Sequence, residues 1–139
     1  IEQLARKRTP VLRFLLPGIP KGHPALESIS ANMIANMLGL GWAATPAGLQ
    51  AMEELEGLEE ERRREGKKFV PQGVASNEMC TFLIINISSL QLIPINMIAY
   101  RTQYGSINPT AIVGPALVAT TVSTIVAAIY CKWKNRKRS

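Results

Sequence analysis

The sequence contains no aspartate and a single histidine among its 139 residues. A metal site usually needs several His, Cys or carboxylate ligands, and a hydrolytic triad needs a histidine paired with an acid. The lone histidine, His23, lies between Gly22 and Pro24 in a loop, and most of the glutamates lie in one charged stretch. These absences argue against an enzyme, and we expect neither a metal nor a cofactor.

Charge is nearly absent from one long region of the chain. Between Met79 and Cys131 the only charged residue is Arg101, whereas basic residues cluster at Arg6 to Arg8, Arg62 to Lys68 and Lys132 to Arg138. The whole chain carries a formal charge of +6 and is 47% hydrophobic. Long apolar runs flanked by basic clusters indicate a polytopic protein of the lipid bilayer and argue against a nucleic-acid binder.

The chain begins with Ile1 and shows no signal-peptide pattern, so we interpret it as a fragment that lacks N-terminal membrane spans. Residues Glu2 to Leu16 mix leucines with basic residues. This pattern fits either a short amphipathic helix at a lipid boundary or the end of a longer helix. Prolines at 17, 20 and 24 then predict a loop.

Residues 25–50 contain one charge, Glu27, yet they are too polar and too rich in glycine for an ordinary membrane span. Asn32 and Asn36 are four residues apart and would share one face of a helix. The residues expected to break this helix are Gly39, Gly41 and Pro46. A broken apolar segment that carries asparagines is typical of a re-entrant hairpin beside a polar cavity. The alternative is that the asparagines only hydrogen-bond to neighbouring helices.

Two further segments, residues 80–100 and 111–131, are predicted to lie in the membrane. On a helical wheel of the first segment, Asn86, Ser89 and Asn96 fall within about a quarter turn and form a polar stripe. Pro94 is expected to kink or break this segment beside the stripe. The second segment would be about 30 Å long, which matches the hydrocarbon core of a bilayer.

The basic clusters predict the orientation of the chain. Residues 53–78 are expected to form a solvated, charged cytoplasmic linker, and residues 132–139 a basic cytoplasmic tail. The first basic cluster also favours the cytoplasm, so the chain between it and the linker must cross the membrane an even number of times, which a re-entrant hairpin satisfies. The predicted fold class is therefore all-α: polytopic membrane helices with a re-entrant, broken helical hairpin.

Four motifs occur in order along the chain: PGIPKGHPA, ANMIANMLGLGWAATPAGLQAMEEL, TFLIINISSLQLIP and RTQYGSINPTAIVG. Together they resemble the spore maturation protein A family of endospore-forming bacteria, within the larger group that carries the nucleoside recognition, or Gate, domain. On this resemblance residues 1–139 form a partial Gate domain. Trp42 stands where some relatives have a small polar residue, and the charged linker is longer than in the family.

The resemblance implies an integral protein of the cell membrane in a sporulating bacterium, which acts with a related second spore maturation protein in dehydrating the spore core. One hypothesis is a permease-like subunit that handles a small polar solute. The solute-lining residues would then be Asn32, Asn36, Thr45, Asn86, Ser89 and Asn96. The alternative hypothesis is a structural scaffold that assembles a maturation complex without transporting anything.

Overall fold

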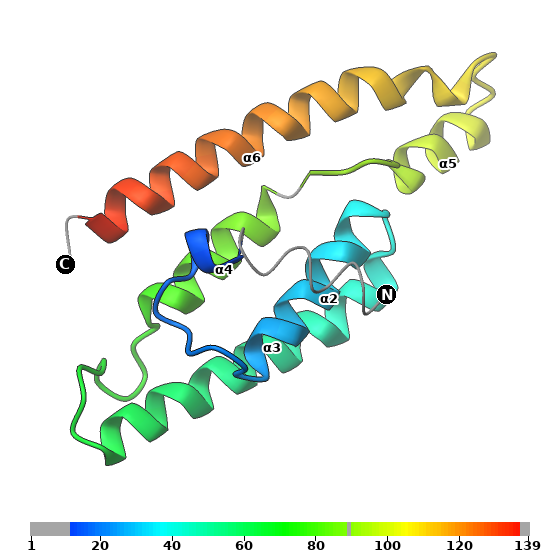
Figure 1. Cartoon of the computed structure of the whole chain (residues 1–139). Helices are drawn as coiled ribbons and strands as arrows, with labels where there is room; N and C mark the ends of the chain where they lie inside the picture. Colours follow the sequence, from blue (N-terminus) through cyan, green and yellow to red (C-terminus); the bar gives the residue numbers. More distant parts are fainter. Residues whose placement is uncertain (1–11, 89, 137–139) are drawn as a thin grey trace.

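The computed structural model describes residues 12–88 and 90–136, and it contains no strand among them. After a helical turn at residues 12–15 the elements are α2 (Ala25–Met37), α3 (Gly41–Arg64), α4 (Asn77–Ile87), α5 (Ile95–Gln103), the 3₁₀ helix η1 (Pro109–Ile112) and α6 (Val113–Arg136) (Figure 1). The predicted all-α class is confirmed. The amphipathic helix proposed for residues 2–16 lies largely outside the described residues.

Helices α2 and α3 form a hairpin whose turn comprises residues 38–40 (Figure 1). Gly39 takes a left-handed conformation with φ of +72°. The N–H groups of Gly39 and Leu40 donate to the carbonyl oxygens of Asn36 and Ala35 at 3.0 and 2.8 Å. This Schellman arrangement satisfies the last carbonyl groups of α2 and ends the helix. Gly41 then begins α3, so the interruption of the helix falls between these two glycines.

Pro46 does not break a helix, and that prediction was wrong. It lies inside α3, near the N-terminal end, where the missing N–H removes a single bond to the carbonyl of Trp42. The helix continues to Arg64 without interruption. The second arm of the hairpin and the start of the predicted linker (residues 53–78) are therefore one continuous helix, with no structural boundary near residue 50.

A hydrophobic core joins the N-terminal segment, the hairpin, α4 and the C-terminal part of α6. Its most buried large side chains are Ile29, Leu55 and Phe82, from α2, α3 and α4, and each is at most 2% exposed. The other members are Leu12, Leu15, Leu16, Ile19, Ala25, Ala51, Leu58, Ile85 and Cys131. Burying a side chain such as Leu or Phe stabilises a fold by about 1.5–3 kcal/mol, so this core holds the hairpin against α4.

Residues Pro109–Arg136, which comprise η1 and α6, form the one candidate membrane span in the described part of the chain. Their mean hydropathy reaches 2.0, and only 6% of the apolar window is buried within the protein. Large side chains such as Val122 and Ile129 are exposed. This exposure fits a membrane location, because the core helix of a soluble protein would be covered. The predicted segment 111–131 lies inside this span, and the basic residues that follow continue α6 as far as Arg136.

The predicted segment 80–100 is not one helix. Helix α4 ends at Ile87, and α5 begins at Ile95 directly after Pro94. The residues described between them are not helical. Pro94 takes the position before the first helical residue, where its missing N–H breaks no helical hydrogen bond. Two short helices with an irregular connection thus run alongside α6 (Figure 1).

Candidate functional site: a carboxamide-lined cleft

The two interruptions of helical structure lie against each other. The N–H of Leu92 donates to the carbonyl of Met37, the last residue of α2, at 2.8 Å. A Cβ added to Gly39 would collide with the carbonyl oxygen of Ile93. We call this contact, between the hairpin turn (residues 38–40) and the connection from α4 to α5 (residues 88 and 90–94), the break junction. A glycine is needed there for its conformation and for the close approach.

The break junction is level with the middle of α6. Thr124 Oγ1 donates to the carbonyl of Ser88 at 2.5 Å, and the N–H of Gln91 donates to Thr120 Oγ1 at 3.3 Å. At 1.5 Å per residue, Thr120 is about 16 Å from one end of the span and Thr124 is about 18 Å from the other. In a bilayer spanned by α6, the junction would therefore lie close to the midplane.

A cleft of about 210 Å³ opens at the junction. It is lined by Asn36, Gly39, Gly41, Gln91, Pro94, Ile95, Asn96 and Met97. None of these residues is charged, and three of them carry carboxamides. The volume accommodates a small molecule, since one water occupies about 30 Å³ in the liquid. The cleft can therefore offer amide and backbone groups to a polar ligand, without charge.

Three asparagines form a hydrogen-bonded chain beside the cleft. Asn32 Nδ2 donates to the carbonyl of Ala44 in α3 at 2.7 Å, and Asn36 Nδ2 donates to Asn32 Oδ1 at 3.2 Å. Asn36 Nδ2 also donates to Asn86 Oδ1 in α4 at 2.5 Å. Asn32 is 2% exposed, and a Cβ at Gly48 would stand 2.8 Å from its Nδ2. This asparagine chain links α2, α3 and α4, and Gly48 leaves room for it.

The six predicted lining residues have different positions. Asn36 and Asn96 line the cleft, whereas Asn32 and Asn86 contact Asn36 and do not line it. Thr45 is exposed and donates to the carbonyl of Gly41 within its own helix at 3.0 Å. Ser89 lies outside the described residues. The predicted polar stripe on one helical face was wrong, because the connection after α4 is not helical and separates Asn86 from Asn96.

Sequence reasoning missed two residues: Gln91, which lines the cleft, and Gly48, which makes room for the asparagine chain. Gln91 lies within the predicted segment 80–100, and its place at the cleft depends on the irregular connection. No local sequence pattern indicates a role for Gly48, because the residue that it contacts, Asn32, lies in the other helix of the hairpin. Trp42, which stands at the start of α3, is 81% exposed and is not among the residues that line the cleft.

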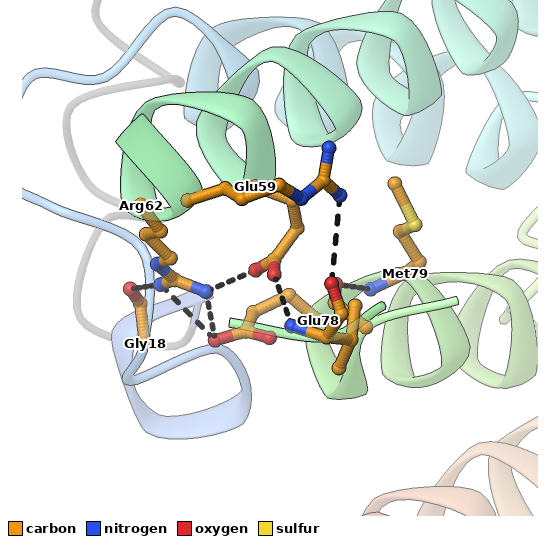
Figure 2. A network of polar contacts seen from close by, with 8 residues as sticks. Gly18, Glu59, Arg62, Glu78 and Met79 are labelled. Carbon is orange, nitrogen blue, oxygen red and sulfur yellow. Dashed lines mark hydrogen bonds and ion pairs between the residues drawn. The ribbon is translucent and has the colours of Figure 1, made fainter. Parts of the chain in front are cut away.

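An ion cluster around Arg62 joins the C-terminal end of α3 to the N-terminal end of α4, at the helix ends that lie away from the cleft (Figure 2). Arg62 donates to the Glu59 carboxylate and to the carbonyl of Gly18, and its guanidinium lies 3.4 Å from Glu78 Oε1. Glu59 is 4% exposed, and its other oxygen accepts the N–H of Val70 at 3.2 Å. The prediction that the charged stretch is merely solvated was wrong for this part, which we call the Arg62 cluster.

The position of Glu78 explains how the Arg62 cluster forms. Glu78 lies in the first turn of α4, where a negative charge is favoured by the helix dipole. A Cβ at Gly18 would collide with the Glu78 carboxylate, so any other residue in this loop would force the Glu78 side chain to shift. The cluster thus fastens this loop, the end of α3 and the start of α4 together, beside a cavity of about 600 Å³.

Comparison with curated proteins finds a similar protein, spore maturation protein A of Bacillus subtilis (strain 168). The two are 40% identical over 141 residues, which cover 99% of this chain and 67% of that protein. No family model matches the chain. No solved structure matches it.

Proposed function

Because this chain belongs to the spore maturation protein A family, we propose that it is a permease-like membrane subunit that handles a small polar solute while the spore core loses water. The observation that supports this role most strongly is the break junction. Two interrupted helical segments meet there, level with the middle of the candidate membrane helix, and they enclose a carboxamide-lined cleft. We further propose that the subunit acts together with a related second spore maturation protein.

The hairpin in this proposal is re-entrant and enters from the cytoplasmic side. Ala25 and Ile29, in the first half of α2, share a core with Cys131 near the basic end of α6. The turn at residues 38–40 contacts the connection that bonds to Thr120 and Thr124 of α6, and α3 returns toward the side of the basic end (Figure 1). The charged second half of α3 then extends to the same side as the basic tail. The positive-inside tendency would make that side cytoplasmic.

The chemistry of the cleft suits an uncharged or weakly polar cargo. Irregular backbone at membrane depth is tolerated where it is buried in protein or lines a polar cavity. In transporters, interrupted helices present free backbone N–H and C=O groups to the substrate near the midplane. Here Gln91 from one interruption converges on the cleft with Asn96, at the start of α5, and Asn36, near the end of α2.

A second candidate function, a membrane scaffold, is favoured by one observation. Asn32 is fully buried and bonds to the backbone of α3, so at least this member of the asparagine chain holds helices together. Interhelical hydrogen bonds of this kind contribute about 1 kcal/mol each in membranes. In a scaffold, the whole chain of asparagines would serve packing, and the cleft would remain unused.

The two functions predict different phenotypes in full-length protein expressed in sporulating cells. For a permease-like subunit, Asn36→Ala and Asn86→Ala should leave membrane levels and partner association intact but yield spores with wetter cores. The control Thr45→Ala should behave as wild type, since this side chain bonds only within its own helix. The readouts are core water content, the amount of protein in the membrane and co-purification of the second maturation protein.

The scaffold function would be favoured by the opposite pattern. In that case any wet-core phenotype of the two asparagine variants is accompanied by loss of the protein from the membrane or of its partner, and a bulky change on a helix-packing surface abolishes complex formation. Ala35→Leu tests the buried surface of the hairpin, and Ser123→Leu tests the exposed surface of α6.

A further inference from the structure

The asparagine chain has a fixed hydrogen-bond direction. The carbonyl oxygen of Ala44 can only accept, so Asn32 must turn its NH₂ group toward it. The Asn32 oxygen then faces Asn36, which must meet it with its own NH₂ group, at 3.2 Å. The amide orientations therefore follow from a backbone group that has no alternative orientation.

The same reasoning fixes which atom of Asn36 remains for the cleft. Asn36 Nδ2 donates both to Asn32 Oδ1 and to Asn86 Oδ1, which uses the two hydrogens of its NH₂ group. Its Oδ1 accepts no hydrogen bond from the residues that the structure describes, and Asn36 lines the cleft. The polar atom that Asn36 can offer to a ligand is thus an acceptor.

We propose that Asn36 Oδ1 is a fixed acceptor in the cleft, and that the ligand is an uncharged molecule presenting an N–H or O–H donor to it. Describing this ligand as a transported solute rests on the proposed function. The eight lining residues include no charged side chain that could compensate a charged ligand. A buried charge without a partner is strongly disfavoured, and an anion would also face the Asn36 oxygen.

Asn32 and Gly48 are positioning residues in this arrangement. The Ala44 carbonyl sets the orientation of the Asn32 amide, which in turn sets the orientation of the Asn36 amide. Gly48 provides the space that Asn32 occupies. An ionised aspartate at position 32 would still accept from the Asn36 NH₂ group, whereas a leucine could not, so Asn32→Leu should release the orientation of Asn36. The binding site would then lose its preference for donors without losing a lining residue.

The experiment measures ligand occupancy in the full-length protein. Exposed Cys80 is replaced by Ser, and Met97→Cys places a reporter thiol in the cleft. The maleimide reaction rate is measured with acetamide, N,N-dimethylacetamide or acetate as the probe. Acetamide should slow labelling, whereas its dimethyl analogue, which lacks N–H groups, and the charged acetate should not. Removing one neutral hydrogen bond by Asn36→Leu should weaken protection by acetamide about three- to tenfold.

Several outcomes would overturn the proposal. These are equal protection by acetamide and its dimethyl analogue, protection by acetate, no protection by acetamide, or full protection in Asn36→Leu. The comparison of probes uses the protein without cleft substitutions other than the reporter, so it stands even if a variant folds poorly. Thr45→Ala is the control, since this side chain lies outside the cleft and bonds within its own helix, and it should retain both protection by acetamide and the donor preference. Labelling reports only whether the cleft is occupied. The proposed function is tested separately by the phenotype of Asn36→Ala, and spores of this variant with a normally dry core would refute it.

Discussion

Replacing Gly39 by alanine tests the break junction directly. Gly39 combines two demands, a φ of +72° and a contact with the carbonyl oxygen of Ile93 that leaves no space for a Cβ. Gly105 shares the first demand but not the second, because its φ is +73° and nothing lies within 4 Å of a Cβ added there. The difference between Gly39→Ala and Gly105→Ala therefore isolates the close approach of the two interruptions.

The expected magnitudes follow from these two terms. A left-handed conformation costs an alanine about 1–2 kcal/mol, which is the whole effect expected for Gly105→Ala. Displacing the backbone at Ile93 should add about 1–3 kcal/mol in Gly39→Ala, as overpacking does elsewhere. The free energy of unfolding can be measured for both variants of the full-length protein in mixed micelles titrated with a denaturing detergent. Equal destabilisation by the two substitutions would show that the hairpin turn does not touch residue 93.

Two further substitutions test the contacts around the cleft and at the far end of the hairpin. Arg62→Gln leaves buried Glu59 without its cation and should lower the free energy of unfolding by about 2–4 kcal/mol, between the limits for exposed and buried pairs. Arg64→Gln, at an exposed pair with Glu60, should change it by about 0.5 kcal/mol or less in the same titration, and equal effects would contradict a buried Arg62 cluster. Asn32→Ala removes the side-chain donor to the Ala44 carbonyl and the acceptor for Asn36, and it should cost about 1–3 kcal/mol; a cost no larger than that of Asn96→Ala would contradict the asparagine chain.

Features set by local sequence were predictable. The span containing α6 follows from an uncharged run of sufficient length, and the end of α2 follows from glycines that interrupt an apolar stretch. Pro46 was misjudged, because one missing hydrogen bond in the second turn does not end a helix whose other hydrogen bonds and packing are kept. The continuity of α3 was missed as well. The sequence changes from apolar to charged near residue 50, but this change in composition does not require the helix to end there.

Features set by distant contacts were not predictable. The connection between α4 and α5 is held by bonds to Met37 on one side and to Thr120 and Thr124 on the other, far away in the sequence. The Arg62 cluster likewise depends on Gly18 and Glu78, which no local pattern associates with the charged stretch. The cleft could thus be predicted as a set of asparagines, but its members and their orientation required the packing of the helices.

The central claim is that a polar cleft lies at the depth of the membrane midplane. Spin labels on full-length protein in lipid vesicles test it, with one label at Gly41→Cys in the cleft and another at Val122→Cys on the exposed face of α6. A Cβ at Gly41 meets no atom within 4 Å, so a label is sterically tolerated there. The measured quantities are the collision rates of each label with oxygen, which concentrates in lipid, and with a water-soluble nickel chelate.

We expect the Val122 label to collide mainly with oxygen and the Gly41 label, at a similar depth, to collide mainly with the nickel chelate. A Gly41 label dominated by oxygen would contradict a polar cleft. Equal access of the nickel chelate to both labels would contradict a membrane-spanning α6.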